Sequence, residues 1–329
     1  MYIGYIKSNL ISNRVSSFKV FGSSTNFSVT TEEECIIDFG DGTTQNISGT
    51  NKTITHNYSS EAEYIITITG NHSSFRAPSE TIEAVSLSDT ITNCSWMFGN
   101  CTNLTKISSN FTIPNSVTNC SSMFYNCSSL TEIPSTLTIP NSVTNCSSMF
   151  NYCTSLTTIP STLTIPNSVT QCNAMFYNCS SLTEIPSTLT IPNSVTDCSW
   201  MFNRCSSLTT IPSTLTIPNS VTNCAYMFSY CSSLTTIPST LTIPNLVTKC
   251  NSMFSGCTKL ISDISNIFPS TFTYTGTINL TSVFHSCSKI TGTAPADKLW
   301  NSGKIFSSSK CFYNCTSLAN YSKIPAGWK

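Results

Sequence analysis

The chain has 329 residues, of which 39% are hydrophobic, so it can bury a core in about two domains. Only 9% of the residues are charged, and 15 basic side chains balance 15 acidic ones, which leaves no strongly charged face. This balance excludes nucleic acid as an expected partner and argues against electrostatic docking on anionic membranes. No stretch reaches the roughly 18 apolar residues of a membrane helix, so we expect no membrane insertion.

The N-terminal segment, 1–14, contains no apolar run long enough for a signal-peptide core and no small-residue cleavage pattern. We therefore expect a protein that reaches a virion or cell surface by a non-classical route, or else stays in the cytoplasm. Assembly into a virus particle that is released by lysis is one such route.

Residues 15–70 show strand-like alternation around an Asp-Gly turn. The turn reads DFGDG at 38–42, and it is followed by HNY at 56–58 and by YIITI at 64–68. This pattern resembles the PKD domain, a small immunoglobulin-like β-sandwich with a Phe-Gly-Asp-Gly turn and a His-x-Tyr motif. The resemblance implies a spacer or interaction module.

The acidic turn raises the question of a metal site. Ile37 stands where the PKD family usually has tryptophan, and Ala62 stands where a glycine usually precedes the last strand. Asp38 and Asp41 carry the oxygen ligands that hard cations such as calcium prefer. We favour the simpler role, in which Asp41 stabilises the turn, and predict no metal site and no cofactor.

A unit of 26 residues recurs through 94–275 and organises the rest of the chain. Such a period indicates stacked supersecondary units, which offer long binding surfaces more often than catalytic pockets. The preceding interval, 71–93, is predicted to be a junction with a half-repeat cap, because Val85 to Leu87 and Ile91 match repeat positions. Each repeat has a first cysteine and a second one seven residues later, and the first cysteines are Cys94, Cys120, Cys146, Cys172, Cys198, Cys224 and Cys250.

Within one repeat, Cys120, Met123, Phe124 and Cys127 have the i, i+3, i+4, i+7 spacing of a single helical face. The run 137–139, Leu-Thr-Ile, alternates as a short strand does. Because every repeat runs in the same direction, stacking predicts a parallel sheet lined by short helices. The expected fold class is an α/β repeat solenoid of about nine rungs, preceded by the small β-sandwich.

The last segment, 276–329, is predicted to hold degenerate repeats and a C-terminal cap. Leu280 replaces the first cysteine of its repeat. In the final repeat, Cys311 stands at the methionine position and Phe312 keeps the phenylalanine.

The recurring run MF-x-N-C-S-S-L-T-x-I-P-x-x-L-x-I-P-x-S-V resembles the leucine-rich repeats of BspA-like proteins, also called the Treponema pallidum type. Its Met-Phe variant resembles a repeat common in mycoplasma surface lipoproteins. The resemblance covers residues 82 to about 322 and implies a leucine-rich-repeat-type solenoid that acts in surface attachment or host interaction.

The cysteines invite a disulfide, metal or catalytic interpretation. Two cysteines seven apart on a helix would lie about 10.5 Å apart, whereas a disulfide needs Cα atoms within about 7 Å. We therefore predict buried structural thiols, and leave bridges between stacked repeats open. His285 lies two residues from Cys287, but such side chains do not face each other on a helix, so no catalytic residue is assigned and no enzyme is expected.

Two outward-facing sets remain as candidate binding surfaces. Exposed aromatic residues anchor protein or sugar ligands, although they can also partly bury against their neighbours. The aromatic set is Trp96, Tyr125, Tyr152, Tyr177, Trp200, Tyr226 and Tyr230. The second set resembles the Thr-x-Thr ladders of ice-binding solenoids, but threonine also simply suits exposed strand positions. This threonine ladder consists of Thr136, Thr138, Thr162, Thr164, Thr188, Thr190, Thr214, Thr216, Thr240 and Thr242.

The sequence predicts a non-catalytic recognition or adhesion protein that presents a neutral Ser/Thr/Asn and aromatic face to a host-surface protein or glycan. A phage tail fibre or another virion attachment protein is one version of this, and multivalent or oligomeric copies would raise its avidity. The alternative is a purely structural virion or scaffold subunit whose solenoid packs against neighbouring subunits. An ice-binding threonine ladder is a minor alternative.

Overall fold

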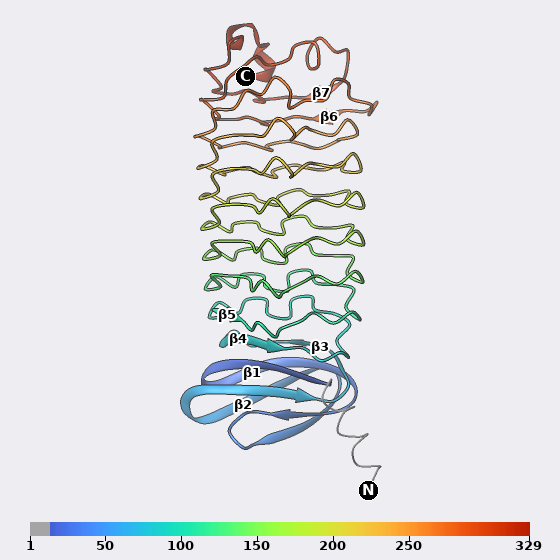
Figure 1. The fold of residues 1–329 in the computed structure, drawn as a ribbon, viewed down its shortest axis with the longest axis vertical. Coiled ribbons are helices and arrows are strands. Elements are labelled where there is room, and N and C mark those ends of the chain that lie inside the picture. The colour runs from blue at the N-terminus through green and yellow to red at the C-terminus, as the bar shows by residue number, and fades with distance from the viewer. Residues whose placement is uncertain (1–13) are drawn as a thin grey trace.

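The computed structural model describes residues 14–329, so the predicted segment 1–14 lies outside the described residues except for Arg14. Figure 1 shows a sheet at the N-terminal end and a tall stack of rungs above it. The elements are β1 (Val15–Asp38), β2 (Thr44–Thr69), β3 (His72–Arg76), β4 (Thr81–Ser86), β5 (Lys106–Ile107), β6 (Ile278–Asn279), β7 (Phe306–Ser307), and the 3-10 helices η1 (Tyr321–Lys323) and η2 (Ala326–Trp328).

Strands form most of the regular structure, and residues 14–329 contain no α-helix. The expected α/β class with short helices is therefore wrong. None of the helices in the described part of the chain has the length and apolar character of a membrane-spanning segment.

The first domain is built on two long antiparallel strands, β1 and β2, which bend around a common core (Figure 1). Ile68 of β2 pairs with Ser16 near one end of β1 and with Ile37 near the other, so β1 folds back to flank the end of β2 on both sides. The register shifts in β1, such as the one between Gly22 and Ser24, allow this bend. Phe18 packs in the core against Phe27 and Phe75, with ring centroids 5.5 and 5.4 Å apart.

The interval predicted as a junction, 71–93, joins the two parts through one continuous sheet. Strands β3 and β4 both pair antiparallel with β1. Strand β4 also pairs in parallel with β5 of the first rung, through Ala84 opposite Ile107. The first domain therefore continues directly into the stack and covers its N-terminal end.

His72 lies buried at this junction and is held by two hydrogen bonds. Its Nδ1 lies 3.0 Å from the carbonyl oxygen of Gly70, so Nδ1–H donates to that oxygen. Its Nε2 lies 2.8 Å from Ser16 Oγ, which donates to it and accepts from the N–H of Ser88 at 2.9 Å. The arrangement fits the neutral imidazole, because its unprotonated Nε2 can accept from the Ser16 hydroxyl.

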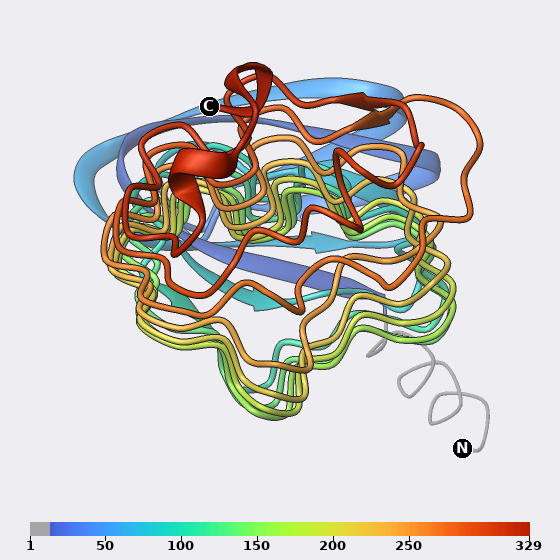
Figure 2. The same cartoon turned by 90° about the horizontal axis from the view of Figure 1, so that it is seen from above.

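Each 26-residue repeat forms one rung, and equivalent residues lie above one another (Figure 2). Single parallel bridges join successive rungs at one column. That column runs Asn93, Asn119, Asn145, Gln171, Asp197, Asn223, Lys249 and Asn279.

The segment predicted as a helix is a run of linked β-turns. Met123 N–H donates to Cys120 O at 3.2 Å within the rung, but the next residue, Phe124, donates to Met149 O of the following rung at 2.9 Å. Ser122 and Asn126 have φ of 55° and 56°, in the left-handed region that a right-handed helix excludes. A helix would direct its N–H groups to carbonyl oxygens within its own segment, whereas the stack sends every second N–H to the next rung.

The predicted burial of this segment is nevertheless confirmed. Cys120, Met123, Phe124 and Cys127 are each 0% exposed. Linked turns return side chains inward at the same three- and four-residue spacing as a helix, so the sequence pattern does not distinguish the two.

The predicted strand at 137–139 is also absent, although Leu137 and Ile139 are buried and Thr138 is exposed as expected. The backbone turns here, with Leu137 N–H donating to Pro134 O at 3.0 Å. Pro134 and Pro140 bring no N–H, so a continuous backbone ladder cannot form at this edge of the rung.

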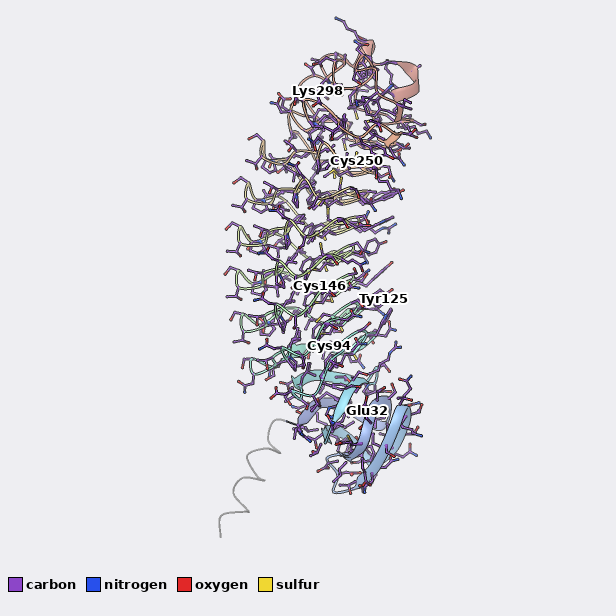
Figure 3. The ribbon with its side chains drawn as sticks, turned by 90° about the vertical axis from the view of Figure 1, so that its right-hand side faces the viewer. Glu32, Cys94, Tyr125, Cys146, Cys250 and Lys298 are labelled. Atoms are coloured by element: carbon purple, nitrogen blue, oxygen red, sulfur yellow. The ribbon has the colours of Figure 1, made fainter. Side chains whose placement is uncertain are left out.

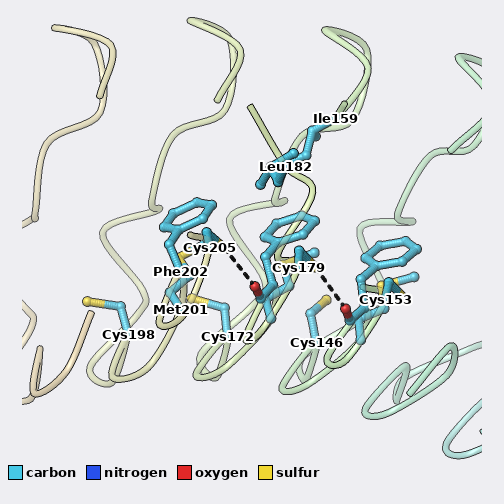
Figure 4. Close-up of a cluster of buried hydrophobic side chains, with 14 of the residues drawn as sticks. Cys146, Cys153, Ile159, Cys172, Cys179, Leu182, Cys198, Met201, Phe202 and Cys205 are labelled. Carbon is cyan, nitrogen blue, oxygen red and sulfur yellow. Dashed lines mark hydrogen bonds between the residues drawn. The ribbon is translucent and has the colours of Figure 1, made fainter. Parts of the chain in front are cut away.

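A column of phenylalanine rings runs through the centre of the stack (Figure 4). Ring centroids of successive rungs lie 5.4 to 5.9 Å apart, and the rings are within 12° of parallel. Phe75 of β3 packs edge-on against the first ring at 5.8 Å, and Trp328 of η2 covers the last at 6.3 Å. The column is Phe98, Phe124, Phe150, Phe176, Phe202, Phe228, Phe254, Phe284 and Phe312.

Truncating one central ring tests how much this column stabilises the fold. Phe176 is fully buried between Phe150 and Phe202, so Phe176→Ala should lower the free energy of unfolding by roughly 3–5 kcal/mol. Urea denaturation followed by circular dichroism measures this. Thr164→Ala, at an exposed position of a neighbouring rung, should change it by less than about 0.5 kcal/mol. A loss below about 1 kcal/mol in Phe176→Ala would contradict the role of the column.

The buried histidine predicts an acid-sensitive junction. Burial lowers the pKa of His72 from its ordinary 6.5, so below pH 6.5 the unfolded chain binds a proton that the native protein does not. Stability should therefore fall with decreasing pH, by at most about 1.4 kcal/mol per pH unit, until the native pKa is reached.

Urea midpoints at pH 7.5, 6.5 and 5.5 measure this dependence. His72→Gln should remove most of it. His285→Gln is the comparison variant and should remove a smaller part of the dependence, because His285 is only half-buried, although burial and Lys310 lower its pKa as well. An unchanged pH dependence in His72→Gln would show that another group is responsible.

Candidate ligand-binding face

Six of the seven aromatic side chains predicted as ligand-binding form one continuous row on an outer edge of the stack; Tyr125 projects there in Figure 3. Each ring touches the next one in chain order, and the centroid distances are 4.8, 5.9, 5.2, 5.8 and 4.0 Å. We call this set the aromatic row, and it consists of Trp96, Tyr125, Tyr152, Tyr177, Trp200 and Tyr226.

The row forms even though its members occupy three different positions of the repeat, namely two, five and six residues after the first cysteine. Positions two and five are the ends of one turn, as the 3.1 Å bond from Tyr125 N–H to Ser122 O shows. Positions two and six take left-handed φ, as at Trp96 (59°) and Tyr152 (61°). All three positions therefore lie on the same edge, and a ring at one of them reaches a ring at another across the rung spacing.

The rings of the row are partly buried by one another and partly open to solvent. Trp96 is 38% exposed and Tyr152 is 37% exposed, whereas the other four are half-buried. The pKa of Tyr177 is raised, first by burial and then by the hydroxyl of Tyr152. Mutual packing fixes the ring positions and leaves an amphipathic strip along the stack.

The seventh predicted residue, Tyr230, shows no ring contact with the row. It is 55% exposed, and the Arg204 guanidinium lies over its ring, 5.5 Å from the centroid. A second guanidinium, that of Arg76 in β3, lies 5.4 Å from the Trp96 ring at the first end of the row.

The threonine ladder is exposed along its whole length and consists of two columns, one that begins at Thr136 and one that begins at Thr138. In the Thr136 column each hydroxyl donates to a serine carbonyl of the preceding rung, for instance Thr136 Oγ1 to Ser109 O at 2.7 Å. These hydroxyls replace the backbone donors that the prolines remove, so they hold rungs together. The other four equivalent bonds, of 2.6 Å each, come from Thr162, Thr188, Thr214 and Thr240.

The acidic turn of the first domain is occupied by internal hydrogen bonds. Asp41 Oδ1 accepts from Thr43 Oγ1 at 2.6 Å and from Thr43 N–H at 3.0 Å, and its Oδ2 lies 2.7 Å from His56 Nε2. The bonds from Thr43 and then His56 lower the pKa of Asp41 to about 2. Asp38 accepts from Gly40 N–H at 2.8 Å. In residues 14–329 no three His, Cys, Asp or Glu side chains gather as a metal site would require.

All eighteen cysteines are unpaired and buried. From Cys127 onward, the second cysteine of each rung donates its thiol to a phenylalanine carbonyl of the preceding rung. Cys179 does so to Phe150 and Cys205 to Phe176, both at 3.2 Å (dashed lines in Figure 4). Burial raises the pKa of both thiols, which keeps them protonated and able to donate.

The predicted separation of His285 from Cys287 is seen in the structure. The Cys287 thiol points into the core and donates to Phe254 O at 3.0 Å. His285 stacks on Tyr313 with centroids 4.8 Å apart, and its Nδ1 lies 2.9 Å from Ser286 Oγ. The two side chains do not form a base and nucleophile pair.

The repeats match a protein family. Residues 92–215, 166–267 and 196–324 each match the family described as "Mycoplasma protein of unknown function, DUF285", and the three segments overlap to span most of the chain. The chain belongs to the DUF285 family. No curated protein and no solved structure matches it.

Membership in the DUF285 family concerns the rungs, because the matched segments begin at residue 92 and leave the first domain outside. The family is associated with BspA-like repeat proteins, so the match supports the interpretation of this chain as a repeat surface protein. The family description assigns no function.

The buried thiols of the DUF285 rungs predict a sharp contrast in reactivity. The folded protein at pH 8 should show almost no reaction with a thiol reagent, because the thiolate is the reactive form and burial disfavours it. After denaturation without reductant, all eighteen thiols should react. Absorbance after addition of a disulfide reagent counts them, and a substantially smaller number after denaturation would mean that stacked cysteines are bridged.

Proposed function

We propose that this protein is a non-catalytic recognition or adhesion protein that binds a host-surface protein or glycan along its aromatic row. The observation that carries the proposal is the convergence of rings from three repeat positions into one line. Burial in the core does not require this, because the core columns are filled by other residues. Rings that are held in place by packing lose little conformational entropy when they bind.

The remainder of the surface supports the same function. Few charges and many Ser, Thr and Asn side chains give a neutral face rich in hydrogen-bonding groups. Such a face suits many weak contacts spread along the stack, and several copies on one particle or cell would add avidity. The surface location, by a non-classical route or on a virion as a tail fibre, is part of this proposal.

For the fold, we infer a leucine-rich-repeat-type solenoid of the BspA-like kind. The support is the in-register parallel stacking and the recurrence of buried Leu and Ile at the same positions, such as Leu130 and Leu156, in successive rungs.

For residues 15–70 we infer a PKD-like spacer. Its two motif segments are in contact, since Phe39 stacks on His56 at 4.0 Å and Tyr58 Oη donates to Phe39 O at 3.2 Å.

The test removes three rings of the row from the full-length chain. Trp96, Trp200 and Tyr226 are changed together to serine, which other rungs carry at the equivalent left-handed position, as at Ser122 (φ 55°) and Ser148 (φ 57°). Binding to intact bacterial and animal cells and to a glycan panel is then measured. We expect a loss of at least about tenfold, since central aromatic contacts are often worth more than 1 kcal/mol each.

The matched control is the triple change of Thr138, Thr190 and Thr242 to alanine, which alters the threonine column that begins at Thr138. This control should bind as the unchanged protein does, and circular dichroism should show that both variants remain folded. Retained binding in the aromatic variant would refute the proposal. If the aromatic variant instead alters the mass of the assembled particle in light scattering, the rival structural role would be favoured; a loss of ice shaping in the control would favour the threonine ladder.

A further inference from the structure

A separate polar pocket of about 430 Å³ opens beside the aromatic row. Its side chains come from three successive rungs. The lining residues are Asn178, Arg204, Ser206, Tyr230 and Ser232.

The pocket results from coordinated changes at one repeat position, six residues after the first cysteine. Asn178, Arg204, Tyr230 and Gly256 follow one another there in successive rungs. The Arg204 guanidinium lies over the Tyr230 ring. At Gly256 (φ 76°) a Cβ atom would lie 2.9 Å from Tyr230 Cδ1, so the glycine makes room for the tyrosine ring.

The guanidinium of Arg204 forms no ion pair within the described part of the chain. Asp197, the acidic residue nearest to Arg204 in the sequence, uses its oxygens on Ser199 N–H at 2.8 Å and Asn223 Nδ2 at 2.8 Å. Arg204 also opposes the rise in the pKa of Tyr177 that burial causes, which places its charge near the row. A cation is thus held over a ring, in the lining of the pocket, without a carboxylate partner among the described residues.

We propose that this pocket binds an acidic sugar through its carboxylate. The guanidinium matches a planar carboxylate with two parallel N–H···O bonds. The hydroxyls of Ser206 and Ser232 and the amide of Asn178 suit sugar hydroxyls, and the exposed part of the Tyr230 ring offers apolar contact to the sugar C–H groups. A single cation among neutral polar groups suits one carboxylate surrounded by hydroxyls better than an acidic peptide, which carries several charges.

The proposal rests on the proposed recognition function and names a ligand class for it. Because the pocket lies beside the aromatic row, one oligosaccharide can place its acidic unit in the pocket and its neutral units on the row. The arginine then selects the ligand by charge, while the rings supply contact area.

The test uses the full-length protein and titration calorimetry with sialyllactose, a glucuronic acid disaccharide, lactose and a short acidic peptide. We expect both carboxylate sugars to bind at least about tenfold more tightly than lactose and than the peptide, with affinity falling as salt is raised. Arg204→Asn should lose this preference. Asparagine stands at the same position with left-handed φ in other rungs, at Asn126 and Asn178, so the variant should fold.

Arg76→Gln is the matched control, because Arg76 also lies over a ring but outside the pocket, and it should keep the preference. Gly256→Ala, which displaces the Tyr230 ring, should weaken binding while it keeps the charge. Equal binding of lactose and acidic sugars, an unaffected Arg204→Asn variant, or a preference for an acidic peptide would each overturn the inference. If that happens while the aromatic triple variant still loses cell binding, the proposed function stands and only the ligand class fails.

Discussion

The structure depends on the sharing of backbone N–H groups between a rung and its neighbour. In the turn segment, N–H groups alternate between a bond inside the rung and a bond to the next rung. Residues with left-handed φ, two and six positions after the first cysteine, produce this alternation. Neighbouring rungs are therefore locked in register, and every buried side chain must recur at the equivalent position of the next rung. The phenylalanine column and the thiol-to-carbonyl bonds follow from that register.

A ladder of this kind leaves unsatisfied groups at its ends, and the chain covers both. At the first end, β4 pairs with β5 and Phe75 packs on the first ring of the column. At the other end, Phe312 N–H donates to Trp328 O at 2.8 Å, and the tryptophan ring covers the last phenylalanine. Exposed ladder ends would invite end-to-end association, so these caps keep the stack finite.

Much of this architecture could be read from the sequence, but not its local geometry. The period, the buried columns and the terminal caps follow from the spacing of Cys, Met, Phe and Leu. The helix prediction failed because linked turns bury residues at helical spacing. Left-handed φ was not evident either, because its positions hold Ser, Trp, Tyr and Arg besides Asn and Gly. The aromatic residues could be selected one by one, but their contacts require the knowledge that three repeat positions share one edge.

Self-similarity at each interface also has a genetic consequence. A rung offers its neighbour the same donors that it accepts from the other side, so a stack with one repeat more or fewer satisfies the same bonds. Unequal recombination between nearly identical repeats can thus lengthen or shorten the protein by about 4.8 Å per unit without disturbing either cap. The reach of the molecule, and the number of rings on its edge, can vary between closely related cells while the fold stays the same.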